Sequence, residues 1–183
     1  VWKCGGCGFE WVDRDALNCV FEPPDYQEYP YNEKIDRWFE RMAPIYRRGL
    51  DTRVKRTLGD GDLSQKAFLD IGCANGEYLR VASSVGFGRV AGVEIDAGAV
   101  KRARRYGPVW QDLSEIEGRF DVVQIKNVLS NIPQFYPFLE QGVAHLNPGG
   151  FLFLDLLNEQ SLTAMLRKVV MDDGRWKMNE DGT

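Results

Sequence analysis

The chain has 183 residues, a formal net charge of −4 at pH 7 and 27% charged residues. This length accommodates one α/β domain with a short appendage, and the acidic balance argues against a nucleic-acid-binding protein. No apolar stretch approaches the roughly 18 residues of a membrane span, and the first residues have no signal-peptide pattern. Four cysteines are too few for a disulfide scaffold. We therefore expect a soluble, cytoplasmic protein without membrane association.

Residues 1–22 form the first predicted unit, a small cysteine-containing appendage. Cys4 and Cys7 stand in the stretch CGGCG, and two thiolates at this spacing can chelate one tetrahedral Zn²⁺. Cys19 could be a third ligand, but no fourth is nearby. The stretch resembles the second half of a zinc ribbon, so Cys4 and Cys7 are expected to hold a structural zinc together with cysteines upstream of Val1. Unligated thiols and a redox pair are the alternatives.

Residues 23–62 form the second predicted unit, a linker followed by a helical cap. Three Pro and three Tyr within residues 21–34 indicate an extended connector, because proline is unfavourable inside a helix. From Glu33 to about Leu58, apolar residues recur at steps of three and four, which predicts a helix. Pro44 is expected to kink or split this helix.

Strands and helices alternate from Ala67 onward, in the third predicted unit, residues 63–183. The predicted strands are residues 67–72, 89–95, 108–112, 120–127 and 151–158. The predicted helices are residues 76–86, 97–107, 134–146 and 159–171, with a turn at 147–150. The first strand is a continuous apolar run, which is typical of a parallel strand buried on both faces. The alternation predicts an α/β fold with a Rossmann-like, doubly wound, mostly parallel sheet.

The stretch FLDIGCANGEYL, residues 68–79, marks the predicted site. In an open α/β sheet, ligands bind beyond the carboxyl ends of the strands. Asp70 lies at the end of the first strand, and the small residues that follow allow a ligand to approach the backbone. Glu94 ends the second strand, 18 residues after Gly76, where an acid can reach ribose hydroxyls. The loop is Gly-x-Ala-x-Gly rather than the dinucleotide-binding pattern, and the acid at the strand end suits a ligand with a cationic end.

Four segments resemble motifs of the class I S-adenosylmethionine-dependent methyltransferases. FLDIGCANGEYL resembles their motif I, VAGVEID the second motif, FDVVQIKNVLSNIP the fourth, and LNPGGFLFLD the turn and fifth strand. The resemblance covers about residues 67–157 and implies a methyl-transferring enzyme with S-adenosylmethionine as its cofactor. Ala74 replaces the usual middle glycine, which is expected to lower affinity without changing the site. The family's fold usually adds two strands after the fifth, so we expect it to be incomplete at the C-terminus.

The resemblance implies a cofactor contact for each matched residue. Contacts to the methionyl end and the nearby ribose are implied for Asp70, Gly72, Cys73, Ala74, Gly76 and Asn127. Contacts to the ribose hydroxyls and the adenine are implied for Glu94, Ile95, Asp112 and Leu113. The methyl group should then point toward the space above the fourth strand, where the acceptor would approach. We name no catalytic base.

Three other features each have two interpretations. His145 is tempting as a base, but it is expected at the opposite end of the sheet. The basic run 101–105 is predicted to be a solvated helix face rather than a phosphate site. Aromatic residues before the core either line the acceptor pocket or simply pack the helix on the sheet: Tyr26, Tyr29, Tyr31, Trp38, Phe39 and Tyr46.

The predicted function is methyl transfer to a small-molecule acceptor. An RNA or protein methyltransferase and a non-catalytic cofactor-binding scaffold are the alternatives. The acidic residues of the cofactor site favour an enzyme over a scaffold, and the negative net charge favours a small molecule over RNA.

Overall fold

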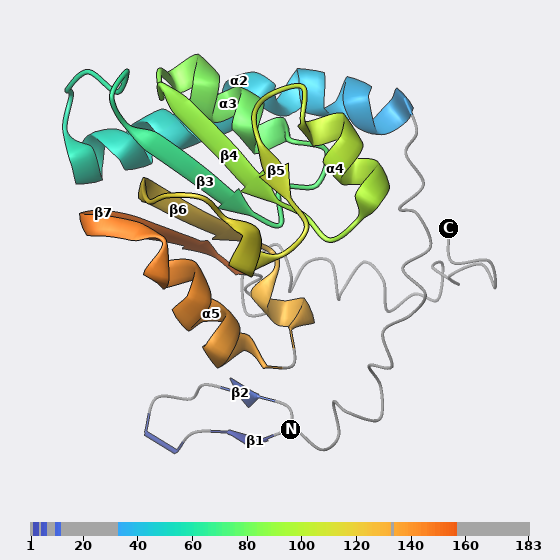
Figure 1. Ribbon diagram of the computed structural model, residues 1–183, viewed down its shortest axis with the longest axis vertical. Coiled ribbons are helices and arrows are strands. Elements are labelled where there is room, and N and C mark those ends of the chain that lie inside the picture. The colour runs from blue at the N-terminus through green and yellow to red at the C-terminus, as the bar shows by residue number, and fades with distance from the viewer. Residues whose placement is uncertain (1, 4, 7–9, 12–32, 133, 157–183) are drawn as a thin grey trace, which may run out of the picture.

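A computed structural model describes residues 2–3, 5–6, 10–11, 33–132 and 134–156. Five parallel strands form the main sheet, in the order β5-β4-β3-β6-β7 (Figure 1). These strands are β3 (Ala67–Ile71), β4 (Arg89–Val93), β5 (Val109–Trp110), β6 (Phe120–Lys126) and β7 (Leu146–Asp155). A separate antiparallel pair joins β1 (Trp2–Lys3) to β2 (Glu10–Trp11). The predicted doubly wound parallel sheet is thus confirmed.

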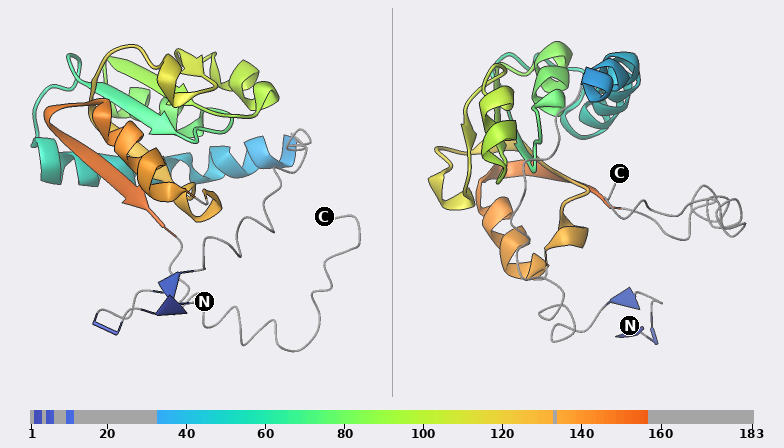
Figure 2. Two further views of the ribbon diagram at one scale, coloured as in Figure 1. Left: turned by 60° about the horizontal axis from the view of Figure 1, so that its bottom comes forward. Right: turned by 90° about the vertical axis from the view of Figure 1, so that its right-hand side faces the viewer.

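Helices cover both faces of the sheet (Figure 2). They are α2 (Glu33–Leu58), α3 (Glu77–Val85), α4 (Ala97–Ala103) and α5 (Phe135–Ala144). Two short 3-10 helices follow strand ends, η1 (Leu113–Glu115) and η2 (Leu129–Asn131). Among the described residues, no helix is both long enough and apolar enough to cross a bilayer.

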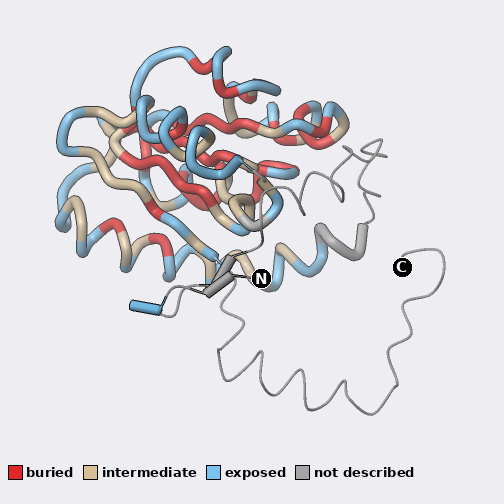
Figure 3. The backbone as a smooth tube through the Cα atoms, turned by 90° about the horizontal axis from the view of Figure 1, so that it is seen from below, coloured by how far each residue is buried: buried red, intermediate tan, exposed pale blue. Residues whose placement is uncertain are grey.

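Side chains alternate between two hydrophobic layers because successive strand residues point to opposite faces. Phe68 and Val122 pack with Leu50 of α2 and with α3 and α4, whereas Leu69 and Val123 pack on the face that α5 covers. Burial is therefore concentrated along the strands (Figure 3). By the same alternation, Asp70 shares the face of Phe68 and lies under α2 and α3.

Several predicted boundaries differ from the structure. Of the kink or split expected at Pro44, the split is wrong, because α2 is one continuous helix of 26 residues. Proline removes only one backbone amide donor from the helix, and Leu50 and Val54 anchor the later turns in the core. The predicted turn at 147–150 lies inside β7 as an irregularity, where the pairing with β6 shifts register. Helix α4 ends at Ala103 rather than at residue 107.

Several predicted segments lie outside the described residues. They include the linker up to residue 32, the helix at 159–171 and the C-terminal segment. The division into units at residues 22 and 62, and the incompleteness of the C-terminal fold, therefore stay predictions.

Candidate functional site

The loop between β3 and α3 lies at the carboxyl edge of the sheet. The backbone of Gly72 (φ 80°), Ala74 (φ 46°) and Gly76 (φ 85°) is left-handed. The amides of Gly72 and Cys73 donate to the carbonyl oxygen of Val93, at 2.8 and 3.0 Å, so the loop curls over the end of β4. A left-handed conformation costs an alanine roughly 1–2 kcal/mol. Ala74 therefore strains the loop backbone, whereas the resemblance to motif I implied only a lower cofactor affinity.

Glu94 ties this loop to the end of β4. Its Oε2 accepts a hydrogen bond from the amide of Ala74 at 2.9 Å, and its Oε1 accepts one from the amide of Asp96 at 3.0 Å. Each carboxylate oxygen has two lone pairs, so each can still accept a bond from a ligand. Glu94 therefore holds the loop in shape as well as offering the acceptors that the sequence predicted.

The ends of β4 and β5 lie side by side next to Glu94. Its amide donates to the carbonyl of Trp110 at 3.0 Å, and the Gln111 side chain donates to the carbonyl of Ile95 at 3.2 Å. Ile95 is 65% exposed, an open apolar surface beside the loop. Asp112 is exposed and accepts bonds from the hydroxyl and amide of Ser114, which lower its pKa. The structure thus places Glu94, Ile95 and Asp112 just after the neighbouring ends of β4 and β5.

Three of the predicted contact residues present little surface at this edge. Leu113 is buried in the core on the α5 side. Cys73 is buried against β4, so closely that a Cβ on Gly92 would lie 2.5 Å from its sulfur. Burial also raises the pKa of the Cys73 thiol, which keeps it inert. Asp70 is only 3% exposed, and burial raises its pKa to about 7.

Asn127 follows β6, which pairs with β3 on the side opposite to β4 and Glu94. Its backbone is left-handed (φ 55°), and its amide donates to the carbonyl of Asp155 at 2.8 Å. Asn127 is exposed at the carboxyl edge of the sheet. The remaining predicted contacts therefore surround the motif I loop from both sides.

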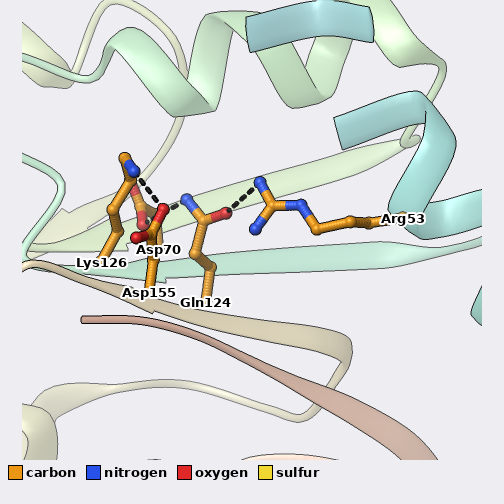
Figure 4. A network of polar contacts seen from close by, with 5 residues as sticks. All are labelled: Arg53, Asp70, Gln124, Lys126 and Asp155. Carbon is orange, nitrogen blue, oxygen red and sulfur yellow. Dashed lines mark hydrogen bonds and ion pairs between the residues drawn. The ribbon is translucent and has the colours of Figure 1, made fainter. Parts of the chain in front are cut away.

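Sequence reasoning missed a polar network under α2 (Figure 4). Its members are Arg53, Asp70, Gln124, Lys126 and Asp155. Lys126 and Asp155 form an ion pair between the ends of β6 and β7, and the Lys126 ammonium lies 5.7 Å from the ring centroid of Tyr78. A signal was present, because Gln124 and Lys126 interrupt the apolar pattern of β6 on alternate positions that share one face.

The features with competing interpretations are partly resolved. His145 lies at the amino edge, where its carbonyl accepts from the amide of Phe120, the first residue of β6. That position confirms that it is remote from the carboxyl edge. In the basic run, Arg104 donates to the carbonyl of Val109, and the Arg105 guanidinium stacks 4.8 Å from the Tyr106 ring centroid.

The aromatic residues of α2 form a cluster. Trp38 and Phe39 contact each other edge-on at 4.9 Å between ring centroids, and Tyr46 lies 5.3 Å from the ring of Tyr78. Burial raises the pKa of Tyr46, and burial raises that of Tyr78 to about 12. Both tyrosines are therefore neutral hydrogen-bonding groups near the carboxyl edge.

Several predicted residues cannot be placed. Tyr26, Tyr29, Tyr31, Cys4 and Cys7 lie outside the described residues. Within the part of the chain that is described, no group of three or more potential ligands could hold a metal ion.

Comparisons with known proteins identify a family and a fold. A family model described as a methyltransferase domain matches residues 33–180. The ubiquinone biosynthesis O-methyltransferase of Bordetella bronchiseptica is 30% identical over 110 residues, covering 54% of this chain and 45% of that protein. The ribosomal protein L11 methyltransferase of Dechloromonas aromatica is 40% identical over 101 residues, covering 50% of this chain and 33% of that protein. The chain thus spans less than half the length of these relatives.

A solved structure shares the fold. The SAM-bound amino pentose methyltransferase from Micromonospora echinaspora superposes with a TM-score of 0.56. It is 19% identical, and the match covers 73% of this chain and 60% of that one. At this identity the likeness concerns the fold alone.

Proposed function

Because the chain belongs to the methyltransferase-domain family whose model matches residues 33–180, we propose that it transfers a methyl group from S-adenosylmethionine to a small-molecule acceptor. The observation that carries this proposal is Glu94. Its carboxylate is fixed by two backbone amides at the carboxyl edge and keeps lone pairs for a ligand. A carboxylate oriented in advance binds hydroxyl groups with less loss of entropy than a mobile one.

The residues at this edge fit the proposed cofactor. Glu94 and Asp112 offer acceptors for ribose hydroxyls and for the adenine amino group, and Ile95 offers an apolar face for a purine ring. The small residues at 72–76 leave the backbone accessible to the methionyl part. Asn127, across β3, is proposed to line the methionine end.

S-adenosylmethionine supplies a methyl group made electrophilic by its sulfonium sulfur. The task of the protein is to align the acceptor with that methyl group and to exclude water. Above the ends of β6 and β7, Lys126 and Asp155 lie with the rings of Tyr78 and Tyr46 under α2. We propose that the acceptor approaches from the side of these groups, where aromatic rings and two charges can orient a polar small molecule.

The small-molecule acceptor is supported by the net charge of −4 and by a relative named for ubiquinone biosynthesis. A protein acceptor is the second candidate, because another relative is named a ribosomal protein L11 methyltransferase. Calorimetric titration with S-adenosylhomocysteine followed by an acceptor screen tests both. Binding with turnover of small phenols, amines or thiols supports the proposal, whereas methylation confined to polypeptides would contradict it.

Glu94→Ala is expected to weaken S-adenosylhomocysteine binding by about 1–3 kcal/mol, because charge-assisted bonds to the ribose are lost and the loop loses its tether. That corresponds to roughly 5- to 150-fold in Kd. Calorimetry measures the change. The matched control is Glu117→Ala, an exposed glutamate near the amino end of β6, for which affinity should be unchanged. Equal affinities of Glu94→Ala and the wild type, with the fold intact, would remove Glu94 from the site.

A further inference from the structure

A glutamine buried in the middle of β6 needs an explanation. Gln124 is 0% exposed and lies between Asp70 of β3 and Phe153 of β7 in the sheet register. Its chain neighbours, Val123 and Ile125, are fully buried as well. An amide buried without partners costs about 1–3 kcal/mol, so such a residue is stable only if both ends of its amide are satisfied.

Gln124 bridges a carboxylate and a guanidinium (Figure 4). Its Nε2 donates to Asp70 Oδ1 at 3.1 Å, and its Oε1 accepts from Arg53 Nη2 at 3.4 Å. Arginine can only donate and an ionised carboxylate can only accept, so these two neighbours fix the orientation of the amide. The Arg53 guanidinium also lies 5.3 Å from the ring centroid of Phe153, which holds it over the sheet.

This chain of contacts leads from α2 to Asp70, near the carboxyl end of β3 and just before the motif I loop. Asp70 stands two residues before Gly72, whose amide is bonded to β4. We infer that Arg53 and Gln124 are positioning residues, which act through Asp70 to hold the loop at 72–76 in the shape that binds the cofactor. The inference rests on the proposed function, and it makes α2 a support of the cofactor site although Arg53 lies over the sheet face rather than at the open carboxyl edge.

The electrostatic surroundings of Asp70 agree with such a role. Burial raises its pKa, and so do the nearby charges of Glu77 on α3 and Glu94 beyond β4. The hydrogen bond from Gln124 and the charge of Lys126 on β6 oppose this shift. Arg53 of α2 is the further charged group facing this cluster, through Gln124. Loss of the Gln124 donor should therefore favour the neutral form of Asp70 at neutral pH.

The test compares Arg53→Met with Arg53→Lys and with Arg48→Met, an exposed arginine on the same helix. Calorimetry with S-adenosylhomocysteine at pH 7.5 should show Arg53→Met weakened by about three- to tenfold, Arg53→Lys partly rescued, and Arg48→Met unchanged. The affinity of Gln124→Leu for S-adenosylhomocysteine should also be measured between pH 6 and 8.5. The midpoint of this affinity–pH profile should lie at a higher pH than in the wild type, a change that lost packing alone would not produce.

A second measurement needs no ligand. The buried Cys73 thiol lies in the loop, so its alkylation rate, followed by mass spectrometry of the peptide, reports how often the loop opens. The Cys73 thiol should be alkylated faster in Arg53→Met than in Arg48→Met when the two variants are compared under conditions that give them the same free energy of unfolding. If the wild type binds no S-adenosylhomocysteine, the proposed function fails, while the labelling still tests whether Arg53 and Gln124 hold the loop through Asp70. Equal labelling of these two variants, or an unmoved pH midpoint in Gln124→Leu, would overturn the inference.

Discussion

Asp70→Asn is expected to raise the free energy of unfolding at pH 8 by up to about 4 kcal/mol. The folded-state pKa of Asp70 is about 7, against the ordinary value of 3.8 for an aspartate in water, and each pKa unit corresponds to about 1.4 kcal/mol. Because the folded-state value is the higher one, the stabilising contribution of Asp70 is full below about pH 4, falls as pH rises, and is lost above about pH 7. Asparagine carries no charge, so this loss should vanish. Urea unfolding between pH 5 and 8.5 measures it.

Asp121→Asn is the matched control for that experiment. Burial works to raise the pKa of Asp121, but bonds from the Ala67 amide and the Lys66 ammonium outweigh it and lower the pKa. Its stabilising contribution is therefore present at neutral pH and lost as pH falls through the folded-state pKa. Asp121→Asn should destabilise the protein at pH 7, opposite in sign to Asp70→Asn. Destabilisation by Asp70→Asn at pH 8 would contradict the account of a costly buried charge.

Gly72→Ala is expected to destabilise the protein by about 2–5 kcal/mol and to abolish cofactor binding. The left-handed backbone (φ 80°) accounts for about 1–2 kcal/mol of this. The added Cβ would also lie 2.2 Å from Val128 Cγ2, and such overpacking typically costs about 1–3 kcal/mol. Thermal or urea unfolding and a calorimetric titration measure the two effects.

Two further variants separate these causes. Gly149→Ala has a similar backbone angle (φ 76°) but meets nothing within 4 Å, so it should show the conformational cost alone. The double variant Gly72→Ala/Val128→Ala should regain the stability lost to the steric clash and keep the loss caused by the left-handed backbone. If Gly72→Ala and Gly149→Ala destabilise equally, the close approach of Val128 to the loop has no energetic role.

The parallel sheet could be predicted from the sequence because strands alternate with helices and the motif I strand is apolar enough to be buried on both faces. The resemblance to the class I methyltransferases, and not the local pattern, implied that Glu94 and Asn127 lie on opposite sides of that strand. The structure has this order, and the parallel direction of the strands puts both residues at the carboxyl edge.

The features that the sequence did not predict depend on contacts between distant residues. Arg53 and Gln124 are 71 positions apart, and no local pattern connects a helix arginine to a strand glutamine. Pro44 stays inside α2 because later turns are buried in the core, which local propensity does not include. The burial of Leu113 and Cys73 is likewise decided by packing against β4 and the α5 face.

The most direct test of the central claim is a crystal structure with S-adenosylhomocysteine bound. The ligand is expected beyond the carboxyl ends of β3, β4 and β6, with its adenine between Glu94 and Asp112 and its sulfur near Asn127. The ribose hydroxyls should contact Glu94 while its bonds to the amides of Ala74 and Asp96 persist. A ligand bound at the amino edge near His145, or with its adenine beside Asn127, would contradict both the site and the proposed function.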